Sequence, residues 1–298
     1  MKLEDVLKED SELIEEKFKE VCQSVHYLSQ EELSPLPEAM EYTFSAGGKR
    51  IRPALVLETC RAFGGDVRSA VSAALAVELV HTYSLIQDDL PCMDNDSVRR
   101  GIPANHIRFG EAIALLASDA LLSESLLIMT NEKRQSPEQI LSCIALLAEA
   151  AGPLGLVGGQ VLDLRGEKES FSYEQLCRLH SKKTGALFKA SVLMGAVCAG
   201  VKPDTEPYRA CEVYARKIGL VFQAMDDVLD VVGDAKKMGK TLGKDEESGK
   251  TTFLSFMSVP EALDFAEQLT AEAKEVIGPY DRYSMLSAIA EKLQKREN

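Results

Sequence analysis

Two short segments of the chain concentrate carboxylates in a pattern that suits a divalent cation. They read DDLPCMD from residue 88 and DDVLD from residue 226, and their aspartates are Asp88, Asp89, Asp94, Asp226, Asp227 and Asp230. Mg²⁺ takes hard oxygen ligands, commonly one or two carboxylates together with phosphate oxygens. One Asp-Asp pair alone is typical of a solvated surface turn. Two clusters among apolar residues, where an unpaired carboxylate is costly, favour a magnesium site.

The local sequence predicts how each cluster is presented. Pro91 should end the helix before it, which leaves Asp88 and Asp89 at a helix C-terminus and Asp94 in a turn that folds back toward them. Carboxylates oppose the helix dipole at that end unless a cation offsets them. In the second cluster, spacings of three and four residues put Asp230 beside the two earlier carboxylates on one helix face.

Basic side chains near these clusters indicate an anionic ligand. Residues 47–53, GGKRIRP, form a flexible loop before a predicted helix start, where Lys49 and Arg52 are spaced to hold an anion. The segment is not a P-loop, because GxxxxGK[ST] is missing. His81 lies two helical turns before Asp88 and shares its face, although a lone His on an apolar helix is more often a core residue. Further basic residues are Arg99, Arg100, Lys182, Lys183, Lys240 and Lys250.

Zinc and disulfide sites are disfavoured. The four histidines, at positions 26, 81, 106 and 180, form no HExxH or similar ligand pair. The seven cysteines are odd in number and scattered, with no CxxC pair. We therefore expect most cysteines to be small buried residues in a reducing compartment.

Helical periodicity dominates the chain that must position these groups. Apolar residues recur every three or four positions, strand-like alternation is nearly absent, and Pro and Gly residues separate the runs. Helices expected over 67–90, 110–130 and 208–232 are apolar on more than one face, as in a bundle interior. No linker-like segment divides the chain, so we predict one all-α domain over residues 1–298.

Composition excludes several function classes. With 34 Lys and Arg against 47 Asp and Glu, the net charge is −13, which disfavours non-specific binding to nucleic acid or to an anionic membrane. The longest uninterrupted apolar stretches fall short of the roughly 18 residues of a membrane span, so none is expected. The acidic, amphipathic N-terminus lacks the features of a signal or transit peptide, and we expect a cytoplasmic protein.

Several motifs follow one another between about Gly47 and Thr252: GGKRIRP, HTYSLIQDDLPCMDNDSVRRG, GGQVLD, KTGALF, FQAMDDVLD, GKTLGKD and GKTT. Together they resemble the short-chain trans-prenyltransferase (polyprenyl diphosphate synthase) family, most closely its bacterial farnesyl and geranylgeranyl diphosphate synthases. The resemblance implies antiparallel helices around a deep central cavity, and normally a homodimer. It also implies that the two aspartate clusters hold three Mg²⁺ on the diphosphate of an allylic substrate.

The resemblance further implies roles for individual residues. The isopentenyl diphosphate site corresponds to Gly48, Lys49, Arg52, His81 and Arg100. The allylic diphosphate site corresponds to Arg99, Lys183 and Lys240, with Lys250 as a further basic residue and with Thr184 and Gln223 beside the developing cation.

The implied reaction explains why these residue types are needed. Diphosphate leaves readily only when Mg²⁺ and Lys or Arg neutralise its charge. The double bond of isopentenyl diphosphate then attacks the allylic carbocation, and a proton leaves with the departing diphosphate as base. Apolar walls exclude water, which would trap the cation.

Product length is expected to depend on Tyr83 and Ser84, five and four positions before Asp88. In the resembled family an aromatic residue at the first of these positions goes with a C15 product, and smaller residues go with C20 or longer products. A rigid ring would close the pocket floor, and further growth of the product chain would then overpack the pocket. The resemblance therefore implies farnesyl diphosphate, with geranylgeranyl diphosphate as the alternative.

Two other interpretations fit the motifs less well. A terpene cyclase uses one allylic substrate and would not need Lys49, Arg52 and His81 for a second diphosphate. A non-catalytic partner subunit would lack one or both aspartate motifs, and both are whole here. Ser97 and Gln87 depart from the family pattern at peripheral positions.

Overall fold

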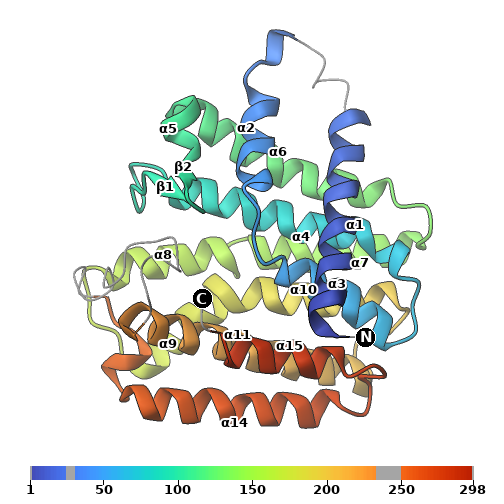
Figure 1. The fold of residues 1–298 in the computed structure, drawn as a ribbon, viewed down its shortest axis with the longest axis vertical. Coiled ribbons are helices and arrows are strands. Elements are labelled where there is room, and N and C mark those ends of the chain that lie inside the picture. Colours follow the sequence, from blue (N-terminus) through green and yellow to red (C-terminus); the bar gives the residue numbers. More distant parts are fainter. Residues whose placement is uncertain (1, 25–30, 233–249, 297–298) are drawn as a thin grey trace.

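The computed structural model describes residues 2–24, 31–232 and 250–296. Within these ranges the chain is helical apart from one short hairpin, which confirms the all-α prediction (Figure 1). The longer helices are α1 (Leu3–Ser24), α2 (Leu36–Ser45), α3 (Ile51–Ala62), α4 (Val67–Asp88), α6 (Glu111–Thr130), α7 (Pro137–Ala151), α8 (Leu156–Gly166), α9 (Tyr173–His180), α10 (Ala186–Cys198), α11 (Glu206–Val232), α14 (Val259–Ile277) and α15 (Met285–Gln294). The short elements are a 3₁₀ turn over Glu31–Leu33, β1 (Val98–Arg99), β2 (Ile102–Pro103), α5 (Asn105–Phe109), a π-helical turn over Ser181–Gly185 and a 3₁₀ turn over Phe253–Ser255.

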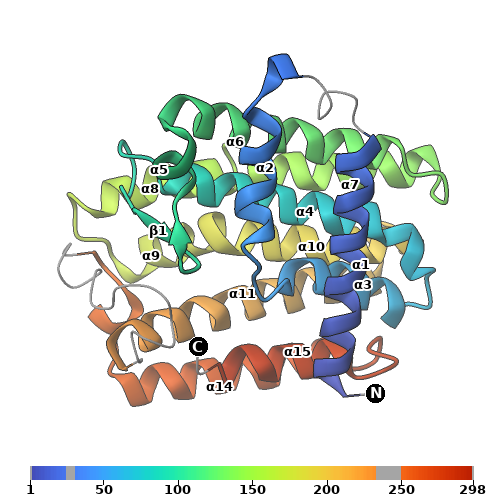
Figure 2. The same ribbon diagram turned by 45° about the horizontal axis from the view of Figure 1, so that its top comes forward.

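Helices α4 and α10 lie at the centre of the bundle. Small residues allow other helices to approach α4 closely, and it packs against α3, α6 and α10. Helix α10 also packs against α7 and α11, while α14 and α15 form an outer layer on α11 (Figures 1 and 2). Residues of α10 belong to both main apolar clusters: Leu187 and Met194 to one, Phe188 and Val192 to the other. The division of the chain into a single domain, 1–298, stays a prediction.

The end of α4 has the geometry that its sequence predicts. The helix stops at Asp88, three residues before Pro91. The following turn folds back, because the backbone N–H of Asp94 donates to the carbonyl of Asp88 at 2.9 Å. The hairpin comes next, with Arg99 opposite Ile102 in antiparallel register. This segment therefore brings Asp94 and Arg99 back toward the C-terminal end of α4.

In the part of the chain that the structure describes, three helical stretches are long and apolar enough to cross a membrane, judged by length and composition: Val67–Asp88, Glu111–Thr130 and Pro137–Gly166. The expectation that no stretch reaches this length is therefore wrong, since small and weakly polar residues extend the apolar runs within these helices. In the most apolar 18 residues of Val67–Asp88, 89% are buried inside the bundle. The corresponding shares are 44% for Glu111–Thr130 and 33% for Pro137–Gly166. The apolar character of α4 is accounted for by its central position.

Candidate active site

A cavity of about 1180 Å³ opens between the C-terminal end of α4, the hairpin, α8, the π-helical turn and α11. Both aspartate clusters contribute to its lining, the first from α4 and the turn after it, the second from α11. The lining carboxylates are Asp88, Asp94, Asp96, Asp163, Asp226, Asp227 and Asp230. Residues 226–230 follow the one-face spacing on α11 that the sequence predicts. The fold therefore brings together two clusters that are 138 residues apart in the chain.

The two aspartates at the end of α4 have different surroundings. Asp89 is 1% exposed and is not part of the cavity lining; both of its oxygens accept from Nε of Arg99, at 2.9 and 3.2 Å. Asp88 lines the cavity, and its carboxylate accepts a hydrogen bond from the amide of Gln160 on α8. Burial raises the pKa of Asp88 to about 6; Lys183 opposes this shift, and Asp94 adds to it. Asp88 is thus a desolvated carboxylate whose ionised form a bound cation would stabilise.

In the second cluster, both carboxylate oxygens of Asp227 accept hydrogen bonds from the protein itself. It accepts from the backbone N–H of Phe253 at 2.8 Å and from the amide nitrogen of Gln223 at 3.0 Å. The amide oxygen of Gln223 in turn accepts from the hydroxyl of Thr184 at 3.1 Å. Asp226 pairs with Arg296, near the C-terminus of the described chain, at 3.3 Å. Thr184 and Gln223 therefore share one hydrogen-bonded chain with Asp227.

A π-helical turn presents Lys183 to the cavity. Such turns widen a helix by one residue and often occur at functional sites. The Nζ of Lys183 donates to Oδ2 of Asp163 on α8 at 2.6 Å, and the Nζ of Lys250 lies 3.3 Å from the same oxygen. Burial lowers the pKa of each lysine, but nearby carboxylates, led by Asp163, more than offset it and raise both pKa values above the ordinary range. The two lysines lower the pKa of Asp163 against the effect of burial.

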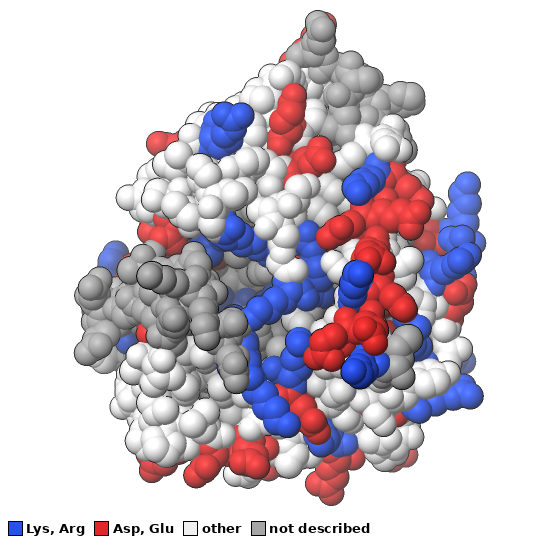
Figure 3. Space-filling view, in the orientation of Figure 1, with Lys and Arg blue, Asp and Glu red and all other residues white. Residues whose placement is uncertain are grey.

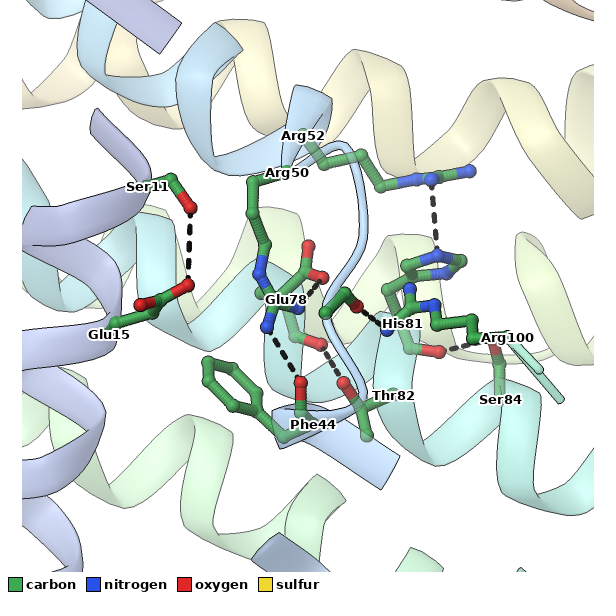
Figure 4. Close-up of polar contacts among 11 residues, drawn as sticks. Ser11, Glu15, Phe44, Arg50, Arg52, Glu78, His81, Thr82, Ser84 and Arg100 are labelled. Atoms are coloured by element: carbon green, nitrogen blue, oxygen red, sulfur yellow. Dashed lines mark hydrogen bonds and ion pairs between the residues drawn. The ribbon is translucent and has the colours of Figure 1, made fainter. Parts of the chain in front are cut away.

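A second group of basic residues lies at the start of α3 and beside α4 (Figure 4). One Nη of Arg52 is 3.5 Å from Nε2 of His81, and the Arg100 guanidinium donates to the carbonyl of Gly47. Burial lowers the pKa of Arg52 to about 10, so it is still cationic at neutral pH. Burial, and then Arg52 and Arg100, lower the pKa of His81 well below its usual value, so its ring is neutral. Burial also lowers the pKa of Lys49.

His81 and Arg100 line the cavity, whereas Gly48, Lys49 and Arg52 are not part of its lining. Arg52 lies beside His81, and Gly48 and Lys49 are exposed in the loop before α3. On the face shown in Figure 3, Lys and Arg side chains gather toward the middle of the molecule, while acidic side chains follow α1. The structure thus places two basic groups around one cavity, one with Lys183 and one with Arg100.

The two residues expected to set product length are both buried. Tyr83 is 2% exposed, its hydroxyl has no hydrogen-bond partner among the described residues, and burial, followed by Asp88, raises its pKa to about 12. The hydroxyl of Ser84 donates to the carbonyl of His81 at 2.9 Å. Neither residue is part of the cavity lining, which takes Leu85 from this part of α4. Lys240 lies outside the described residues.

Three polar residues of the site were not predicted from the sequence: Gln160, Asp163 and Arg296. The first two belong to the GGQVLD motif, which was recognised without a role for its polar members. No comparable signal marks Arg296, because its proximity to Asp226 depends on how the last helix packs.

The carboxylates suit Mg²⁺ bound together with a substrate. Among residues 2–24, 31–232 and 250–296, no three His, Cys, Asp or Glu side chains form a metal site by themselves. Mg²⁺ commonly takes only one or two protein carboxylates and fills its octahedron with phosphate oxygens and water. The carboxylates on the two cavity walls, with cationic side chains between them, fit that mode of binding.

Comparisons with known proteins agree with this site. The family model described as polyprenyl synthetase matches residues 34–280. Geranylgeranyl diphosphate synthase of Cyanophora paradoxa is 46% identical over 264 residues, covering 88% of this chain and 87% of that protein. The heterodimeric geranylgeranyl pyrophosphate synthase large subunit 1 of Arabidopsis thaliana is 43% identical over 269 residues, covering 88% of this chain and 72% of that protein.

Solved structures show the same fold. An FPP/GFPP synthase from Zymomonas mobilis superposes with a TM-score of 0.85 at 33% identity, covering 98% of each chain. A geranyltransferase from Helicobacter pylori, complexed with magnesium and isoprenyl diphosphate, superposes with a TM-score of 0.82 at 33% identity, covering 97% of this chain and 96% of that chain.

Proposed function

Because this chain belongs to the polyprenyl synthetase family and is a trans-prenyl diphosphate synthase, we propose that it extends allylic diphosphates with isopentenyl diphosphate to the C20 product, geranylgeranyl diphosphate. The observation that carries the C20 assignment is the similarity to proteins named as geranylgeranyl diphosphate synthases, at 41 to 46% identity over 88% of this chain. The position of Tyr83 is compatible with it, because this ring lies in the core and does not line the cavity.

Farnesyl diphosphate, the C15 product, is the second candidate. It is favoured by the identity of Tyr83, an aromatic residue five positions before Asp88, and by the name of the Zymomonas mobilis structure. The two candidates differ in one condensation only, so they share every other element of the proposal.

In this proposal carboxylates on both walls of the cavity hold the metal. Asp88 and Asp94 on one wall, and Asp226 and Asp230 on the other, would hold Mg²⁺ with the diphosphate of the allylic substrate. Bound Mg²⁺ supplies charge neutralisation of the leaving diphosphate. Asp89 instead orients Arg99, since its oxygens accept from that guanidinium.

The remaining residues bind and shield the substrates. Lys183 and Arg99 face the allylic diphosphate and stabilise the negative charge that develops as it leaves. Thr184 and Gln223 line the cavity, and we assign to their oxygens the stabilisation of the allylic cation. Phe222, together with Leu85, gives the cavity apolar surface that excludes water from that cation.

The second diphosphate belongs to isopentenyl diphosphate. Arg100 and the neutral His81 line the cavity, one Nη of Arg52 lies 3.5 Å from His81, and Lys49 lies in the loop before α3. The two arginines and the lysine form a cationic group separate from Lys183. A cyclase acting on a single allylic diphosphate has no use for this second group. The two-site arrangement therefore supports condensation over cyclisation.

We also propose that the protein is a homodimer. Helix α6 exposes Leu115, Leu116 and Leu127, at 45%, 53% and 52%, and a second copy of the chain would bury them. Light scattering after size exclusion measures the mass directly, and a monomer at micromolar concentration would contradict this part of the proposal. The cytoplasmic location stays a prediction.

Product length is tested by incubating the enzyme with labelled isopentenyl diphosphate, Mg²⁺ and a C5 primer, followed by chromatography of the dephosphorylated products. We expect C20 from the wild type. We also expect C20 from Tyr83→Ala, with a loss of folding stability of about 3 to 5 kcal/mol from the cavity left in the core. A C15 product in the wild type that lengthens to C20 in Tyr83→Ala would instead establish the farnesyl assignment and the role of Tyr83 as the pocket floor.

A further inference from the structure

A buried ion pair lies behind the second cationic group. One Nη of Arg50 is 2.5 Å from Oε1 of Glu78 on α4, and the two residues are 4% and 2% exposed. Neither residue lines the cavity, so neither is placed to contact a substrate there. A buried ion pair is weak evidence for stability, because desolvation offsets most of its attraction. Its position at this site points to another role.

Arg50 fixes the loop that precedes α3. Its own backbone is left-handed, with φ of 46°, and Gly47 and Gly48 before it also have positive φ, of 87° and 140°. The second Nη of Arg50 donates to the carbonyl of Phe44 at 2.7 Å, and the guanidinium stacks over the Phe44 ring at 4.2 Å. The side chain thus ties the loop to the end of α2 and to α4 at once. Figure 4 shows it directed toward Glu78 and Phe44, away from Arg52.

Residues 47–50, which Arg50 holds in place, support the side chain of Arg100. The Arg100 guanidinium donates to the carbonyl of Gly47, and it packs so closely on Gly48 that a Cβ there would lie 2.8 Å from its nitrogen. Any movement of residues 47–48 would therefore move Arg100, which lines the cavity.

Glu78 also offsets the repulsion among neighbouring cations. Burial lowers the pKa of Arg52 and of Arg100, and in both cases the negative charge of Glu78 is the strongest opposing influence. Without a counter-charge the three arginines, Arg50, Arg52 and Arg100, would repel one another, because protein shields them from the bulk water that would screen their charges. The negative charge of Glu78 therefore offsets the positive charges of all three arginines, although its carboxylate accepts a hydrogen bond only from Arg50 among them.

We propose that the Arg50–Glu78 ion pair is the positioning element of the isopentenyl diphosphate site: it fixes loop 47–50 and through it sets the place of Arg100 and Arg52. This inference rests on the proposed function for the identity of the anion. Two effects of removing Glu78 oppose each other. Loss of a negative charge strengthens attraction for a diphosphate, whereas loss of the partner leaves Arg50 charged and uncompensated in a buried place. The second effect dominates, because a buried charge that loses its partner is forced to move or to draw in water, and the loop moves with it.

The test measures the KM of each substrate and, separately, the Kd of isopentenyl diphosphate alone by calorimetry. Arg50→Met and Glu78→Gln should each raise the KM and the Kd for isopentenyl diphosphate by about 10- to 100-fold, the effect of a small misplacement of binding groups. The KM of the allylic substrate should stay within about twofold. The double variant Arg50→Met/Glu78→Gln should be no worse than the worse single variant, because both substitutions break one unit.

Glu58→Gln is the matched control. Glu58 on α3 is 1% exposed, pairs with Arg61 at 2.9 Å and does not line the cavity, so Glu58→Gln repeats the chemical change away from the substrate site. It should leave both KM values unchanged. If Glu78→Gln bound isopentenyl diphosphate as tightly as the wild type or more tightly, or raised both KM values equally, the positioning role would be wrong. A wild-type enzyme that fails to condense the two substrates would instead contradict the proposed function.

Discussion

Asp163 provides the sharpest test of how the site is organised, because it bridges two lysines from different parts of the chain. Its Oδ2 lies 2.6 Å from Nζ of Lys183 and 3.3 Å from Nζ of Lys250. The substitution Asp163→Asn keeps the size of the side chain and removes its charge. Lys183 is then without the carboxylate that holds it at the cavity wall, whereas Lys250 retains Glu167 at 3.2 Å.

The expected decrease in kcat/KM of Asp163→Asn follows from the loss of the hydrogen bond between Lys183 and Asp163. A hydrogen bond to a charged group contributes about 1.5 to 3 kcal/mol when partly shielded from solvent, and here the lysine side chains are 28% and 21% exposed. The substitution removes the equivalent of one such bond, because Lys250 keeps a second partner. At about 1.4 kcal/mol for each factor of ten, kcat/KM for the allylic substrate should fall by about 10- to 150-fold.

Steady-state kinetics with the allylic substrate varied measures this decrease, and circular dichroism checks the fold. Glu169→Gln is the control, because Glu169 forms an exposed ion pair with Arg165 close to the same helix and should contribute little. An Asp163→Asn enzyme with unchanged or higher kcat/KM would refute the reasoning. It would mean that Asp163 competes with the diphosphate for Lys183 instead of positioning the lysine.

Three further predictions address other parts of the molecule. Asp226→Ala should lower kcat by orders of magnitude with the helical circular dichroism signal intact, because it removes a proposed metal ligand used in the ionising step; turnover near that of the wild type would remove the second cluster from the mechanism. Lys49→Ala should chiefly raise the KM of isopentenyl diphosphate and Arg99→Ala that of the allylic substrate, which kinetics with each substrate varied in turn would show; the reverse pattern would exchange the two sites. Burial, followed by the neighbouring Glu58, raises the pKa of Asp10 to about 8, above its unfolded value of about 3.9. The folded state therefore holds this proton more tightly, and the free energy of unfolding should fall as pH rises from about 4 to about 8. Urea unfolding of Asp10→Asn should show a smaller fall than the wild type, and equal pH dependence would rule out this carboxyl as the cause.

Local patterns were enough to predict the elements that carry the aspartates. Pro91 ended α4 where expected, and the turn after it brought Asp94 back to Asp88. The spacing of residues 226–230 needed only helix geometry. These features depend on residues within about two helical turns of each other, so a single sequence contains them.

The polar contacts between helices could not be predicted in this way. Glu78 is one carboxylate in an apolar helix, and its partner Arg50 is 28 residues earlier in the chain. Asp163 meets Lys250 across 87 residues. Such pairs are set by how helices pack, which periodicity does not specify. Tyr83 is buried in the core and does not line the cavity, so its role as the pocket floor stays a prediction.

The central claim is that this cavity joins two diphosphate substrates and continues to C20. It is tested most directly by supplying farnesyl diphosphate and labelled isopentenyl diphosphate with Mg²⁺, and by measuring the label in lipid product against the diphosphate released. We predict geranylgeranyl diphosphate and diphosphate in equal amounts, with no product when isopentenyl diphosphate is omitted. Consumption of farnesyl diphosphate without incorporation of label, or a cyclised hydrocarbon formed from it alone, would contradict the claim.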